Sequence, residues 1–140
     1  MSEQLYTTEI LRLAASLHGP RQLERIDGEA ELRSPTCGSR IRMAVHLDDE
    51  RRVRMISQHV HACAFGQAAA ALLERHAIGR ARDEVSETLL LLSRWLAGDE
   101  DEAGDWPGLA ALEPARRRKA RHGAILLPFR TLLAAIEAAR

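Results

Sequence analysis

The sequence predicts a single α+β domain in which a three-stranded antiparallel sheet is packed on one face by helices. Apolar and polar residues alternate over residues 39–47 and 51–60, which is the period of half-buried strands, whereas other segments show helical patterns. The chain has 140 residues, of which 46% are apolar. A chain of this size can bury one core but is short for two, so residues 1–140 are expected to form one domain.

The N-terminal half is predicted to contain one helix and the whole sheet. An apolar stripe at helical spacing predicts a helix over residues 3–17, and the Gly-Pro pair after it is a stop signal. The alternating runs at 39–47 and 51–60 are joined by three acidic residues and are predicted to form an antiparallel hairpin. A third strand around residues 29–33 is expected to join this hairpin.

The C-terminal half is predicted to be helical. The alanine- and leucine-rich run from Cys63 predicts a helix that stops at Gly79, and a second apolar stripe ends at Gly98. The acidic run GDEDEAGDWPG that follows is predicted to be a solvated loop. A last apolar stripe marks a terminal helix, and Pro128 is expected in or just before its first turn, because proline cannot donate a backbone hydrogen bond.

Charge and hydropathy exclude several classes of function. Twenty basic residues balance twenty acidic ones, so no overall field attracts nucleic acid or an anionic membrane. No stretch approaches the roughly 18 apolar residues of a membrane span, and a cytoplasmic location is expected. The basic run at 115–122 is most simply a solvated helix end. Docking to an acidic partner is the second interpretation, and nucleic-acid contact ranks low because no aromatic residues interleave with the basic ones.

The two cysteines are the main candidates for chemistry. Cys37 lies in the Pro- and Gly-containing turn RSPTCGSRIRM, and Cys63 lies at a strand-to-helix junction. Thiolate and imidazole ligands suit zinc and iron–sulfur centres. In the run QHVHAC, His59 and His61 share one face with Cys63 if the strand extends that far. The structural alternatives are an inert buried thiol and exposed strand histidines.

The cysteine turn, followed by a hairpin and a thiol at the head of an alanine-rich helix, resembles a known family. The segment SPTCGSRIRM is similar to the N-P-x-C-G-D motif of the N-terminal NifU-like scaffold proteins of iron–sulfur cluster assembly, the IscU/SufU type. The long insertion LSRWLAGDEDEAGDWPGLAAL resembles the SufU branch. The resemblance implies a SufE/NifU-like fold. It also implies a role as cluster scaffold, or as zinc-dependent sulfur acceptor from a cysteine desulfurase.

The sequence departs from the family pattern at several positions. Ser39 replaces the aspartate after the first cysteine, and Ala62 replaces the glycine before the second. Where the family has its third cysteine, this chain offers His122 or the glycine after it. The resemblance therefore implies a ligand set for zinc or an iron–sulfur cluster that consists of Cys37, Cys63 and His122, with His61 as a further metal candidate. Cys63 is the candidate sulfur acceptor, because a helix N-terminus favours an anionic thiolate.

Two other functions stay open. Loss of the aspartate and of the third cysteine favours a degenerate family member that binds no cluster and acts as a binding or regulatory module. A thiol hydrolase or transferase using Cys63 with His61 or His122 would need an orienting carboxylate and an oxyanion hole, which the sequence does not display. We therefore expect a scaffold or transfer protein rather than an enzyme. The partners that the family implies are a cysteine desulfurase and apo iron–sulfur proteins, without membrane or nucleic acid.

Overall fold

The strands β1 (Gly28–Arg33), β2 (Arg40–Leu47) and β3 (Val53–His61) form an antiparallel sheet in the order β1-β2-β3. The structure is a computed structural model and describes residues 6–35 and 38–140. Met43 of β2 pairs with Ala30 of β1 and with Gln58 of β3. The predicted hairpin, the third strand and the α+β class are confirmed.

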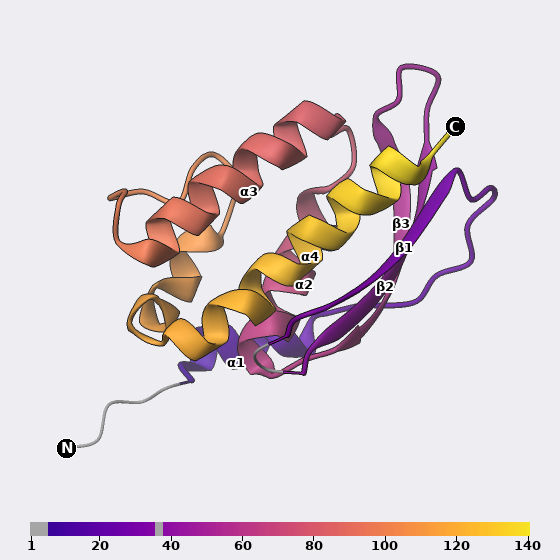
Figure 1. Cartoon of the computed structure of the whole chain (residues 1–140). Coiled ribbons are helices and arrows are strands. Elements are labelled where there is room, and N and C mark those ends of the chain that lie inside the picture. The colour runs from indigo at the N-terminus through magenta and orange to yellow at the C-terminus, as the bar shows by residue number, and fades with distance from the viewer. Residues whose placement is uncertain (1–5, 36–37) are drawn as a thin grey trace.

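The helices gather on one face of this sheet (Figure 1). They are α1 (Thr8–Ala15), α2 (Ala64–His76), α3 (Arg82–Ala97), the 3-10 helix η1 (Leu109–Arg117) and α4 (Lys119–Ala138). Helix α4 contacts β1, β2, α2 and α3, whereas α3 contacts α4 and η1 but no strand. The order of layers is therefore sheet, then α2 and α4, then α3.

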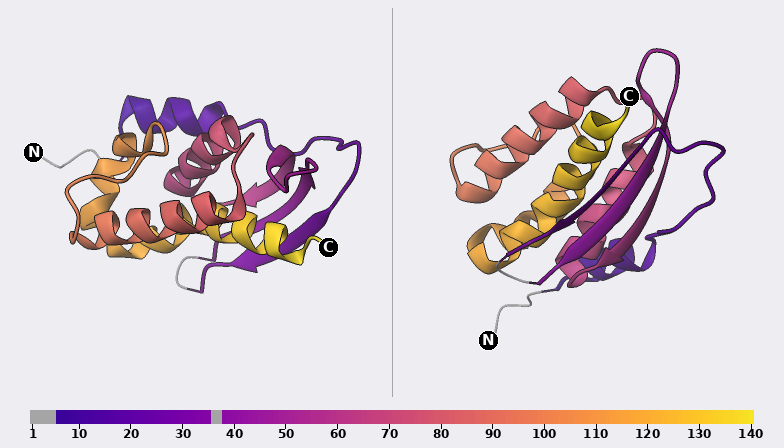
Figure 2. Two further views of the ribbon diagram at one scale, coloured as in Figure 1. Left: turned by 90° about the horizontal axis from the view of Figure 1, so that it is seen from above. Right: turned by 45° about the vertical axis from the view of Figure 1, so that its right-hand side comes forward.

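The two faces of the sheet have opposite character. Ile41, Met43 and Val45 of β2 point into the helical layer and are 0% exposed. The alternate residues face away from the helices, and the segment between α1 and β1 runs past that side (Figure 2). Its backbone is anchored there, because the Arg21 N–H donates to Ser57 Oγ at 2.8 Å. Much of the outer face stays open.

Helix α4 approaches β1 closely at Gly28. A Cβ added to Gly28 would lie 2.0 Å from the carbonyl oxygen of Ala135, which is far below a van der Waals contact. Only glycine lets the strand and the helix backbone come this near. The close approach seals the C-terminal half of α4 against the sheet.

Two predicted helix boundaries were wrong. The first helix begins at Thr8 rather than residue 3, because Thr7 caps it: Thr7 Oγ1 accepts a hydrogen bond from the Ile10 N–H at 3.1 Å. The terminal helix begins at Lys119, so Pro128 lies well inside it and not in or before its first turn. A proline there removes one helical hydrogen bond, and the loss is tolerated because α4 packs against β1, β2, α2 and α3.

The acidic segment after α3 is only partly the solvated loop that the sequence predicts. Its carboxylates are exposed, but Trp106 is 2% exposed and donates from Nε1 to the carbonyl of Leu72 at 3.0 Å. The Trp106 ring meets Phe129 edge-on, with 5.3 Å between centroids. Trp106 therefore packs this segment against the core. The 3-10 helix η1 that follows the segment was not predicted from the sequence.

Candidate functional site

Cys63 is the N-cap residue of α2, at the point where β3 gives way to the helix. Its backbone is extended, with φ −66° and ψ 174°, and its thiol is free and partly exposed. Gln67 holds this junction from both sides. Its N–H donates to the Cys63 carbonyl at 2.9 Å, and its side-chain Nε2 donates to the Ala62 carbonyl at 3.0 Å. Sequence reasoning did not single out Gln67.

The first turn of α2 lies directly against α4. A Cβ added to Gly66 would stand 2.6 Å from the Ala62 Cβ and 3.3 Å from the Ala124 Cβ. Because residues i and i+3 share a helix face, Gly66 lies one turn beyond Cys63 on that side. Ala124 is thus the α4 residue that faces the head of α2. The signal for this contact was the glycine inside an alanine-rich helix, which is unfavourable unless two elements approach closely.

His122 lies in the first turn of α4, beside the end of η1. Its Nε2 is 2.9 Å from the Ala115 carbonyl oxygen and 3.1 Å from that of Arg116. Two carbonyl acceptors require Nε2 to carry the proton, so only Nδ1 of a neutral ring keeps a lone pair. The side chain is half-buried and does not point freely into solvent. His122 therefore joins η1 to α4, which the sequence did not predict.

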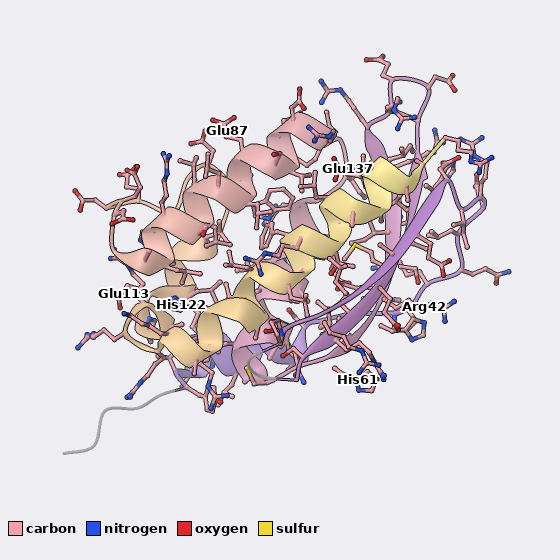
Figure 3. All side chains as sticks on the ribbon, in the orientation of Figure 1. Arg42, His61, Glu87, Glu113, His122 and Glu137 are labelled. Carbon is pink, nitrogen blue, oxygen red and sulfur yellow. The ribbon has the colours of Figure 1, made fainter. Side chains whose placement is uncertain are left out.

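The other predicted histidines lie on the outer face of the sheet. His61 ends β3 and is exposed, and His59, on the same face, is also exposed. Figure 3 shows His61 below the sheet and His122 at the start of α4, at separate places in the molecule. The structure does not bring His61 and His122 to one point.

The ligand set expected from the sequence includes Cys37, which lies outside the described residues. Among residues 6–35 and 38–140, no three His, Cys, Asp or Glu side chains group as metal ligands. The described residues alone therefore do not make the tetrahedral site that structural zinc requires. Ser39, at the end of the cysteine turn, is buried, and its carbonyl accepts from the Ser34 N–H at 2.8 Å. The set of Cys37, Cys63 and His122 stays a prediction.

Similar proteins are found among solved structures. No family model matches the sequence, and no curated protein matches it. A nitrogen-fixing NifU-like protein (N-terminal) from Brucella abortus has 30% sequence identity and a TM-score of 0.86, and the match covers 96% of this chain and 93% of that chain. The chain belongs to the NifU-like N-terminal family.

Two further structures share the fold of this NifU-like chain. One, from Fervidobacterium islandicum AW-1, is described as an iron–sulfur cluster assembly scaffold for the SUF system. It has 19% identity and a TM-score of 0.83, and covers 94% of this chain and 96% of its own. The other is a hypothetical protein with 23% identity, a TM-score of 0.77 and coverage of 92% and 94%. At these identities the two structures support the fold alone.

Proposed function

We propose that the protein works in iron–sulfur cluster assembly, as a scaffold or as a sulfur acceptor whose cargo is held at Cys63. The observation that carries this proposal is the 30% identity to a NifU-like protein across 96% of the chain. The free, partly exposed thiol of Cys63 at the head of α2 supplies a group with suitable chemistry. The expected partner is a cysteine desulfurase, and the expected location is the cytoplasm. No helix among the described residues is long and apolar enough to cross a bilayer.

Sulfur transfer to Cys63 is balanced without any further reagent. The Cys63 thiolate attacks the outer sulfur of a persulfide on the desulfurase, and the desulfurase thiolate leaves with the electron pair of the broken S–S bond. Cys63 then carries the persulfide. If Cys37, which lies outside the described residues, joins Cys63 and His122 as ligands, zinc held by them would favour the thiolate form of Cys63.

The alternative function, a binding or regulatory module without cargo, is favoured by one observation. The α4 residue that packs against the head of α2 is Ala124, which cannot bind metal, while His122 Nε2 is occupied by two carbonyl groups. This arrangement leaves fewer ligands near Cys63 than the family pattern has.

The test compares cargo loading in three proteins. The wild type, Cys63→Ser and the control Ala64→Ser are reconstituted anaerobically with iron and sulfide, and separately incubated with a cysteine desulfurase and L-cysteine. Bound iron and sulfide are assayed chemically, and sulfur on Cys63 is detected by mass spectrometry. We expect loading of wild type and Ala64→Ser and loss in Cys63→Ser. If the wild type takes up neither a cluster nor sulfur, the scaffold and sulfur-acceptor functions are both excluded, and the binding or regulatory module remains.

A further inference from the structure

A row of basic and imidazole side chains crosses the open face of the sheet at the end nearest Cys63. Arg33, Arg40 and His61 are lateral partners, because Arg33 pairs with Arg40 and Arg40 pairs with His61. In the next row on this face, Arg42 pairs with His59. We call these five residues the cationic row. Arg42 and His61 lie on the outer side of the sheet in Figure 3.

The cationic row is unfavourable for the fold. Like charges placed directly opposite each other on neighbouring strands destabilise a sheet. Arg42 is partly compensated by Glu29 at 3.1 Å. Among the residues that the structure describes, however, neither Arg33 nor Arg40 has an ion-pair partner. Sequences break such local rules mainly where a site needs the residues.

Arginines at the opposite end of the molecule are arranged differently. Arg52 lies 2.7 Å from Glu84, and Arg82 lies 2.8 Å from Glu137. Both pairs join separate elements, in the way expected of surface charges that support a fold. Within the part of the chain that the structure describes, Arg33 and Arg40 have no such carboxylate partner, so their charges are open to a binding protein.

The position of the cationic row relates it to the candidate site. Arg33 is the last residue of β1 and Arg40 the first of β2, so they flank the turn that contains Cys37 in the sequence. His61 ends β3 two residues before Cys63, the N-cap of α2. A protein that reaches Cys63 from the open side of the sheet would meet the cationic row.

A hollow continues the cationic row toward the middle of the sheet. Its volume is about 160 Å³, and its lining includes Arg42 and His59 together with three apolar side chains, Leu23, Ile26 and Ala44. Ile26 is 57% exposed, so its side chain is accessible to a protein that binds here. The hollow can take an apolar side chain from whatever binds the arginines.

We propose that the cationic row and the hollow dock a carboxylate-rich segment of the protein that delivers persulfide sulfur to Cys63. This inference rests on the proposed function. Carboxylates would pair with Arg33 and Arg40, and an apolar neighbour would enter the hollow. A nucleic acid fits less well, because its evenly spaced phosphates would run from Arg33 and Arg40 onto Glu29 and Glu31 of the same face, whereas a short carboxylate segment needs only the two arginines. The described strand residues of this face also include no Phe, Tyr or Trp side chain for base stacking.

The test uses the full chain and a cysteine desulfurase from the same organism. Arg40→Glu places a carboxylate opposite Arg33 and His61, so it should raise the melting temperature while it weakens docking about tenfold or more. A purely structural role for Arg40 would not separate these two effects. Arg33→Glu is the second variant, and Arg130→Glu, an exposed α4 arginine, is the matched control. Affinity is measured at low and high salt, and docking should weaken with salt in the wild type.

Each outcome decides the proposal. Docking that is equal in wild type, Arg40→Glu and Arg33→Glu would overturn it, as would no docking of the wild type at all. Stronger, Arg40-dependent binding of a DNA duplex would replace it with a nucleic-acid site. Iron and sulfide reconstitution of the same variants needs no partner protein. If the variants load iron and sulfide but bind the desulfurase as tightly as the wild type does, the docking proposal fails and the proposed function stands.

Discussion

Gly66 of α2 and Ala124 of α4 lie so close that a Cβ on residue 66 would stand 3.3 Å from both the Cβ and the carbonyl oxygen of Ala124. The same Cβ would overlap the Ala62 Cβ at 2.6 Å. Glycine inside a helix costs about 1 kcal/mol relative to alanine when nothing else intervenes. The contact therefore offsets this cost by fixing α2, with Cys63 at its head, against α4.

Gly66→Ala is expected to destabilise the protein despite its better helix propensity. The added methyl group must push α2 away from Ala62 or Ala124, and such overpacking costs about 1–3 kcal/mol. Chemical denaturation measures this loss, and Ala64→Gly serves as a control for propensity alone. The displaced helix should also change the rate at which Cys63 reacts with iodoacetamide. A variant as stable as the wild type, with an unchanged rate, would contradict the close approach.

Much of the fold could be predicted because local patterns decide it. The alternation in β2 and β3 and the acidic turn between them specify the hairpin, and Gly98 ends α3 with φ +89°. Pro128 was misplaced because tertiary packing on both sides of α4 overrides its poor helix propensity. The burial of Trp106 was missed for a related reason: its partners, Leu72 and Phe129, are distant in sequence.

The site was harder to predict than the fold. Cys63 was located correctly at a strand-to-helix junction, because composition changes sharply there. The role of His122 at η1 could not be read from the sequence, since it depends on a 3-10 helix with little periodic signal. The alanine side chain of Ala124 has no group that could bind a metal or react, so nothing in the sequence points to it as a site residue. Only its position against Gly66 shows which face of α4 meets the head of α2.

The Asp27 carboxylate is expected to make the free energy of unfolding decrease at acid pH. Hydrogen bonding from the Leu47 N–H at 2.7 Å, and then from Arg25, holds the pKa of Asp27 below its usual value. A depressed carboxyl pKa stabilises the fold above the unfolded-state pKa of about 3.9, and this contribution is lost as pH falls through the folded value. Asp27→Asn should thus lower the free energy of unfolding at pH 7 by about 1–2 kcal/mol.

The difference between Asp27→Asn and wild type should shrink as pH falls below about 4, because the wild-type carboxyl is then protonated too. Urea unfolding at several pH values measures it. Asp105→Asn, in the exposed acidic loop, is the control and should track the wild type throughout. A difference that stays constant down to pH 2 would show that the charge of Asp27 is not the cause.

His122 can be tested for two roles at once. His122→Ala removes one hydrogen-bond donor from each of the Ala115 and Arg116 carbonyls, although Ala115 keeps the Arg118 N–H, and should cost about 1 kcal/mol of stability. His122→Gln restores an N–H donor and should recover part of this loss. If Nδ1 is also a ligand, as the resemblance implies, both variants should lose as much bound iron as Cys37→Ser does. Full iron loading of His122→Gln would remove His122 from the ligand set.

Ala124→Cys is expected to increase the capacity of the protein to hold a cluster. Ala124 packs against Gly66, and Gly66 lies one helical turn from Cys63. A thiol at residue 124 would therefore face the head of α2. Thiolates are the usual ligands of iron–sulfur clusters, and a third one should retain the cluster longer. The measurement is iron and sulfide per chain after anaerobic reconstitution and desalting, together with the visible absorption of the cluster. Ala120→Cys adds a thiol at an exposed position in the first turn of α4 and should leave retention at the wild-type level. Equal retention in both variants would mean that cargo is not held between α2 and α4, and the binding-module function would then be favoured over the scaffold.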